Sequence, residues 1–363
     1  MERVLLAVFR RNYPLAASST RYPRFPISLT ASFHRPRHFL SSSSKGKGDD
    51  ESSPPSTVLK SEFVDTNSRA VGQVIFLNSS KSGQAILLSL AIGDPTLSAF
   101  AALGAATANS SAKLVGLEAN SLENGLCGYN GALIGCAVSA FGPSFFPLAV
   151  TSTLVGAAAT PLLAASLKNA LTMPQWTWSF NAIALTSLLQ SRPLIQSTVA
   201  VESSVENTTR FADLALSPIV GISQIFVVES YLTGAGIIGA IGMYSPKLAL
   251  HALGGSIIGS ITGILSGADL SNIAMGLWGY NSALASMAVG TFFVNSRETI
   301  ALSAFGAASS AALFGAMQPV FGMHGVPCLT LPFCTVASMC FLLEGQVPGL
   351  VLAKEPHSPE KNT

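Results

Sequence analysis

The chain has 363 residues, of which 49% are hydrophobic and only 10% are charged, with a formal net charge of +2 and a mean hydropathy of +0.48. Soluble domains carry about 25% charged residues, so this composition excludes an ordinary soluble protein and predicts an integral, multi-pass membrane protein. Period-two alternation of apolar and polar residues is missing, which favours an all-α architecture over a membrane β-barrel.

The first segment of the chain, residues 1–62, is predicted to lack a fold of its own. Residues 1–40 hold seven arginines and a single acid, Glu2, and they are rich in serine. This composition is typical of an organellar transit peptide, although a disordered cytoplasmic tail or a misassigned start codon fits equally well. Residues 41–62 have no apolar period and are interpreted as a linker. The polar residues 351–363 are likewise predicted to be disordered.

Long uncharged stretches follow, and each can hold one or two membrane spans of about 20 residues. The stretch 84–112 has Asp94 as its only charge, and residues 124–167, 270–296 and 299–343 have none. Apolar patterning predicts helices near 84–107, 113–122, 125–142, 145–168 and 178–190, and again near 214–228, 234–244, 247–266, 276–294, 299–317 and 328–343. The polar residues 191–210 between the two series are predicted to form an exposed loop, and they hold a glycosylation sequon at Asn207.

The two series of helices are copies of each other. Residues 124–135 (NGLCGYNGALIG) return 151 positions later as residues 275–286 (MGLWGYNSALAS), with seven of twelve identical. Two further blocks recur in the same order, namely residues 72–83 as 223–234 and residues 173–181 as 326–334. Three blocks at nearly one offset indicate a duplicated structural unit. We therefore predict a first membrane repeat over residues 63–190 and a second over residues 211–350.

Short or interrupted hydrophobic segments stand at matching places in the two repeats. They are the blocks around Gln73 and Gln224 and the blocks around Pro174 and Pro327. Paired broken segments are the best sequence indication of a transport site, because half-helices that meet in mid-membrane direct their ends at a solute.

The paired blocks resemble those of the urea transporter family. The family's three signature segments stand here as GQVIF and SQIFV, as NGLCGYNGALIG and MGLWGYNSALAS, and as MPQWTWSF and VPCLTLPF, and the resemblance covers about residues 65–345. It implies two inverted repeats of five transmembrane helices plus a short pore half-helix each, a homotrimer with one pore per subunit, and channel-like passive transport of urea.

The resemblance also implies which residues line the pore. Urea carries one carbonyl acceptor and four N–H donors, so its site needs uncharged hydrogen-bonding groups between flat apolar walls. By the family's pattern, Gln73 and Gln224 orient the solute in the outer parts of the pore, while Thr177 and Thr330 line its midpoint. Aromatic slot positions are Phe76, Tyr129 and Tyr280, and the adjoining wall positions are Val74, Leu133, Ile225, Val227 and Leu284. A slot of this kind offers a hydrated ion nothing in exchange for its water.

Other interpretations remain open from the residues alone. Core packing explains any single apolar position, and hydrogen bonding between helices explains the glutamines and threonines. The pore alternatives are another small neutral or weakly basic solute, such as short amides, ammonia or water, or proton-coupled urea transport. Candidate coupling groups are Asp94, Glu118, Glu123, Glu229, His251 and Asp269.

No enzymatic, metal or cofactor site is predicted. The HExxH and GxSxG patterns are absent, and the five cysteines lie in apolar segments without a CxxC pair. The expected partners are urea, the lipid bilayer and further copies of the chain, with no role for nucleic acid. The family resemblance favours the plasma membrane, whereas residues 1–40 favour an organellar membrane.

Overall fold

The computed structural model describes residues 55–196 and 211–363. Within these residues the chain forms fourteen α-helices and one short 3-10 helix, and the only strand-like pairing is an isolated bridge between Phe293 and Leu352. The all-α prediction is therefore confirmed. The transit-like residues 1–40 and the sequon at Asn207 lie outside the described residues.

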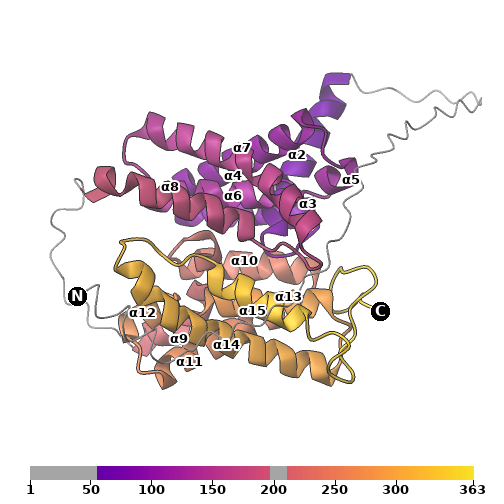
Figure 1. Ribbon diagram of the computed structural model, residues 1–363, viewed down its shortest axis with the longest axis vertical. Coiled ribbons are helices and arrows are strands. Elements are labelled where there is room, and N and C mark those ends of the chain that lie inside the picture. Colours follow the sequence, from indigo (N-terminus) through magenta and orange to yellow (C-terminus); the bar gives the residue numbers. More distant parts are fainter. Residues whose placement is uncertain (1–54, 197–210) are drawn as a thin grey trace, which may run out of the picture. The chain divides into compact units, whose positions relative to one another are not determined.

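The helices fall into two matching series (Figure 1). The first consists of α2 (Pro55–Gln73), α3 (Ser80–Gly93), α4 (Pro95–Leu114), α5 (Ala119–Glu123), α6 (Tyr129–Phe141), α7 (Phe146–Ala170) and α8 (Trp178–Gln196). The second consists of α9 (Phe211–Ser223), η1 (Gln224–Phe226), α10 (Tyr231–Tyr244), α11 (Pro246–Leu265), α12 (Leu270–Ala274), α13 (Tyr280–Phe292), α14 (Arg297–Gly322) and α15 (Leu331–Phe341). Each of α10 to α14 begins 151 residues after its counterpart among α3 to α7. The duplication therefore extends to the helix boundaries.

Sharp corners after α3 and α10 have the same local cause. Asp94 and Ser245 are extended, and each is followed by a proline, whose ring disfavours the helical conformation in the residue before it. Each side chain then accepts a hydrogen bond from a backbone N–H in the first turn of the next helix. The single helix predicted over 84–107 is therefore wrong, because Asp94 ends α3 and caps α4.

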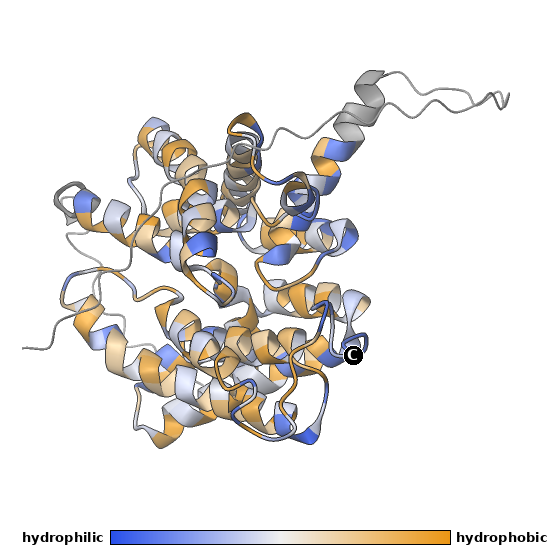
Figure 2. Cartoon of the chain, turned by 45° about the vertical axis from the view of Figure 1, so that its right-hand side comes forward, coloured by the Kyte–Doolittle hydropathy of each residue, from blue (hydrophilic) through white to orange (hydrophobic). Residues whose placement is uncertain are grey.

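Three helices are long and apolar enough to cross a membrane by length and composition: α7, α11 and α14. A fourth candidate is the pair formed by Phe211–Phe226 and α10, which is bent by 78° at the break between them. Only 33–39% of the apolar window in the three long helices is buried inside the protein, which leaves most of that surface for lipid. Figure 2 shows hydrophobic residues along most helices, with hydrophilic residues mainly at helix ends and connections.

Small residues let neighbouring helices touch through their backbones. A Cβ atom on Gly104 of α4 would lie 2.0 Å from the carbonyl oxygen of Gly131 of α6, so no larger residue fits there. In the second repeat Ser282 stands at the position of Gly131, and its hydroxyl donates to the carbonyl oxygen of Ala307 in α14 at 2.8 Å. The two copies thus keep the same close packing with different chemistry.

Some polar segments have more structure than their composition predicted. Helix α2 begins at Pro55, inside the predicted linker, and α8 runs to Gln196, inside the predicted loop. The tail 351–363 is packed rather than disordered: the Asn362 amide donates to three carbonyl oxygens at the end of α13, those of Gly290, Thr291 and Phe293, at 2.8–3.3 Å. These carbonyls lack partners inside the helix, which is why a distant amide can bind them.

Candidate functional site

The two glutamine blocks have the same geometry in both repeats. Gln73 ends α2 and Gln224 begins η1, and both side chains are half-buried. The Gln73 amide nitrogen donates to the carbonyl oxygen of Asn124 at 2.9 Å, and that of Gln224 donates to the carbonyl oxygen of Met275 at 2.8 Å. Because the NH2 group is engaged with a carbonyl, each amide has a fixed orientation and presents its oxygen as an acceptor.

The chain reverses sharply after each glutamine. Phe76 has φ 66° and Val227 has φ 62°, which is the left-handed region that side-chain-bearing residues rarely adopt. The signature blocks show the same feature at Trp176 (φ 44°) and Leu329 (φ 51°). These four are the only non-glycine residues with positive φ in the described part of the chain, and they form two repeat-related pairs. Clustered backbone strain of this kind is typical of functional sites.

The tyrosines hold the signature blocks in place. The Tyr129 hydroxyl donates to the carbonyl oxygen of Trp176, and the Tyr280 hydroxyl donates to that of Leu329 at 2.7 Å. Both accepting carbonyls belong to residues with positive φ, Trp176 and Leu329. The hydroxyls of the two predicted slot tyrosines therefore donate to backbone carbonyl oxygens.

The two signature threonines meet. Thr177 Oγ1 lies 2.7 Å from Thr330 Oγ1, and both residues are only 3% exposed. Asn181, in the first turn of α8, donates to Thr330 Oγ1 at 2.9 Å, and Cys334 Sγ lies 3.1 Å from Thr177 Oγ1. A compact, uncharged polar cluster therefore sits where the repeats join.

Aromatic rings gather on one side of this cluster. The ring centroid of Phe76 lies 6.3 Å from that of Trp176, 6.2 Å from that of Phe292 and 6.3 Å from that of Phe333, with edge-to-face geometry. The repeat counterparts of Phe76 and Trp176 are the aliphatic Val227 and Leu329. The two ends of the site thus differ in their walls.

The remaining predicted wall residues are deeply buried in the same hydrophobic core: Val74, Leu133, Ile225 and Leu284 are 1–3% exposed. Phe76 and Val227 are partly buried and pack against that core. Burial at this level fits a narrow pore wall and core packing alike, so the pore role of these side chains stays a prediction.

Within the described ranges, none of the ionisable candidates hydrogen-bonds to the threonine cluster, and each has another partner or is exposed. Glu118 accepts a hydrogen bond from Lys168 at 3.0 Å, and this bond, together with one from Ser121, lowers the pKa of the Glu118 carboxyl. Asp94 and Asp269 cap helices, and Glu123 and Glu229 are exposed. His251 Nδ1 lies 2.8 Å from Ser303 Oγ. No group of three His, Cys, Asp or Glu side chains within the described ranges is arranged to hold a metal ion.

Sequence reasoning missed three residues of the site. Asn281 donates to the carbonyl oxygen of Leu329 at 3.2 Å and accepts from the Phe333 N–H at 3.2 Å, which joins two pore blocks. The sequence did hold an indication that Asn281 matters, because the triplet Gly-Tyr-Asn recurs in both repeats. Asn181 follows the first signature directly, and Trp176 carries one of the strained carbonyls, but nothing in their residue types indicated these roles.

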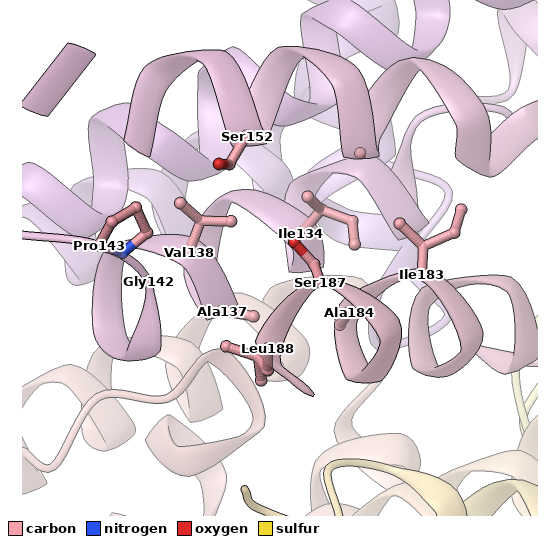
Figure 3. Close-up of a pocket in the computed structure, with 11 residues that line it drawn as sticks. Ile134, Ala137, Val138, Gly142, Pro143, Ser152, Ile183, Ala184, Ser187 and Leu188 are labelled. Atoms are coloured by element: carbon pink, nitrogen blue, oxygen red, sulfur yellow. The ribbon is translucent and has the colours of Figure 1, made fainter. Parts of the chain in front are cut away.

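A separate hollow lies between α6, α7 and α8 (Figure 3). Ile134, Val138, Ser152 and Ile183 are among the residues that line it, and none of the predicted pore residues does. It is therefore not the candidate site.

Comparisons with known proteins place the chain among related sequences. The family model described as "Urea transporter" matches residues 64–345. The chain is similar to "Urea transporter 1" of Ovis aries and of Capra hircus, each 31% identical over 326 residues that cover 83% of this chain and 83% of the relative. "Urea transporter 1" of Rattus norvegicus is 30% identical over 262 residues, covering 67% of this chain and 68% of the relative.

Proposed function

Because the chain belongs to the urea transporter family and transports urea, we propose that the solute passes between its two repeats, uncoupled from any ion, through a pore whose midpoint is the Thr177–Thr330 pair. One observation carries this proposal: two hydroxyls 153 residues apart, from equivalent places in the repeats, lie 2.7 Å from each other. Core packing does not require matched hydroxyls at this junction, whereas a site shared by two repeats does.

The proposed path runs from one glutamine to the other. The Gln73 and Gln224 oxygens accept solute N–H groups in the outer parts, and the threonine hydroxyls replace lost water at the narrowest point. Leaving one amide hydrogen bond unmatched costs about 1–3 kcal/mol, so several acceptors in a row are needed for rapid passage. Phe76, Tyr129 and Tyr280 form the flat walls together with Val74, Leu133, Ile225, Val227 and Leu284.

Among the described residues, no charged side chain hydrogen-bonds to Thr177 or Thr330, which supports uncoupled flow. A proton-coupled or sodium-coupled transporter normally keeps an ionisable group in mid-membrane. Here Asp94 and Asp269 serve as helix caps, and Glu118 pairs with Lys168. Urea flux that depended steeply on a pH or sodium gradient would overturn this part of the proposal.

The larger assembly follows the family expectation. We propose that residues 63–190 and 211–350 are inverted repeats and that three copies of the chain assemble, each with its own pore. The plasma membrane is the expected residence, and the basic residues 1–40 support an organellar alternative. Imaging the tagged protein with and without residues 1–40 distinguishes the two, and the mass of a purified complex in nanodiscs tests the trimer.

The direct test measures urea permeability of the purified chain in liposomes by stopped-flow light scattering. Thr177→Val and Thr330→Val keep the side-chain shape but remove the midpoint hydroxyls, and each should lower urea permeability by about tenfold, the effect of about 1.4 kcal/mol. Thr186→Val and Thr335→Val are matched controls on α8 and α15, the helices that directly follow Thr177 and Thr330, because the hydroxyls of Thr186 and Thr335 donate to carbonyl oxygens of their own helix. Unchanged permeability in both midpoint variants would remove the threonines from the pore.

A further inference from the structure

The Asn181 side chain links the two repeats at the threonine pair. It is 1% exposed, and every polar atom of its amide is used. Its nitrogen donates to the carbonyl oxygen of Thr177 and to Thr330 Oγ1, both at 2.9 Å, while its oxygen accepts from the Thr330 N–H at 3.1 Å. The Thr177 carbonyl can only accept and the Thr330 N–H can only donate, so the amide cannot turn over without losing both bonds.

The second repeat has no equivalent of this amide. The counterpart of Asn181, 153 residues later, is Cys334, whose thiol is a weak donor and a weak acceptor. The midpoint is therefore asymmetric, with Thr330 held through both its backbone and its hydroxyl by a residue of the first repeat. The Thr177 hydroxyl, by contrast, has Thr330 and Cys334 as its only side-chain partners among the described residues.

We propose that Asn181 is a positioning residue that sets the direction of the hydrogen bond between the Thr177 and Thr330 hydroxyls. Through this direction it sets the preference of the pore for solutes rich in N–H groups. The amide occupies one lone pair of Thr330 Oγ1, which disfavours a second donor at that oxygen and leaves the Thr330 proton to donate to Thr177 Oγ1 in the proposed arrangement. The lone pairs left on the two hydroxyl oxygens then face the solute as acceptors. This inference rests on the proposed function, since it requires the threonines to line the pore.

Urea and acetamide distinguish this role from a purely structural one. The two solutes have similar size and one carbonyl each, but urea has four N–H donors and acetamide two. Asn181→Leu should lower urea permeability by about tenfold, the effect of about one lost hydrogen bond, and acetamide permeability by much less. The ratio of urea to acetamide permeability therefore falls. Asn109→Leu is the matched control, because Asn109 is also buried but bonds to Asn67 within the first repeat, and it should leave the ratio unchanged.

A double variant tests whether Asn181 acts through Thr330. The ratio in Asn181→Leu/Thr330→Val should equal the ratio in Thr330→Val alone, because the group being oriented is gone. Additive losses, or an equal fall for both solutes in Asn181→Leu, would overturn the proposal.

Assembly is checked first by size-exclusion chromatography. If the Leu variant does not assemble, Asn181→Asp carries the test, since it keeps the size and the acceptor while removing both N–H donors. Failure of both variants to assemble would assign Asn181 a structural role and refute the inference. If the Thr177→Val and Thr330→Val variants show unchanged urea permeability, the proposed pore itself is refuted. If those variants have lowered urea permeability but Asn181→Leu leaves the ratio of urea to acetamide permeability unchanged, only the role of Asn181 is refuted.

Discussion

Tyr129 and Tyr280, the two tyrosines of the proposed pore, should differ in their contribution to stability although they are repeat counterparts. Among the described residues, the carbonyl oxygen of Trp176 receives a side-chain hydrogen bond only from the Tyr129 hydroxyl, whereas that of Leu329 receives one from Tyr280 at 2.7 Å and a second from Asn281 at 3.2 Å. Tyr129→Phe leaves a buried acceptor without its partner, which costs about 1–3 kcal/mol. Tyr280→Phe removes one of two donors and should cost only about 0.5–1.5 kcal/mol.

Thermal unfolding in detergent, followed by size-exclusion chromatography, measures the difference. The midpoint temperature should fall further for Tyr129→Phe than for Tyr280→Phe. The combination Tyr280→Phe/Asn281→Leu strips both donors from the Leu329 carbonyl and should lower the midpoint at least as far as Tyr129→Phe. The reasoning would be refuted if the two single Phe variants lowered the midpoint temperature equally, or if the double variant lowered it no further than Tyr280→Phe. Either result would show that stability does not depend on how many donors each carbonyl has.

Two further predictions concern the backbone strain and the tail. Val227→Gly should destabilise the protein less than Val228→Gly in the same unfolding assay, because glycine relieves about 1–2 kcal/mol of left-handed strain at φ 62° and Val228 has no such strain. Burial of the His357 ring, stacked 5.1 Å from Tyr244, lowers the pKa of His357, and the charge of Lys361 lowers it further. Docking of the tail therefore gains from neutral His357 above the unfolded pKa of about 6.5 and loses this gain as the pH falls through the lower docked value. Trypsin cleavage of the tail should accelerate between about pH 7.5 and 5.5 relative to His357→Gln measured at each pH; equal pH dependence in both proteins would contradict it.

The duplication made much of the helix order and the paired site residues predictable. A copy at a nearly constant offset, 151 residues for the glutamines and 153 for the threonines, pairs Gln73 with Gln224 and Thr177 with Thr330 without any knowledge of the fold. The corner at Asp94 was missed because the apolar run continues through it, although the following proline was a readable signal. The packed tail was not readable, since Asn362 binds carbonyls about 70 residues away and polar composition carries no information about such a contact.

The strained residues could not be predicted, because glycine is the expected residue at positive φ and none of these four is glycine. They nevertheless occur as repeat pairs, Phe76 with Val227 and Trp176 with Leu329. Each pair keeps its backbone conformation while an aromatic side chain in the first repeat stands opposite an aliphatic one in the second. What both copies retained is therefore the path of the backbone, and in each signature block the carbonyl of the strained residue accepts a hydrogen bond from the tyrosine of its own repeat. The side chains diverged on that path, because Phe76 and Trp176 stand where the second repeat has Val227 and Leu329, and the amide of Asn181 stands where it has the thiol of Cys334.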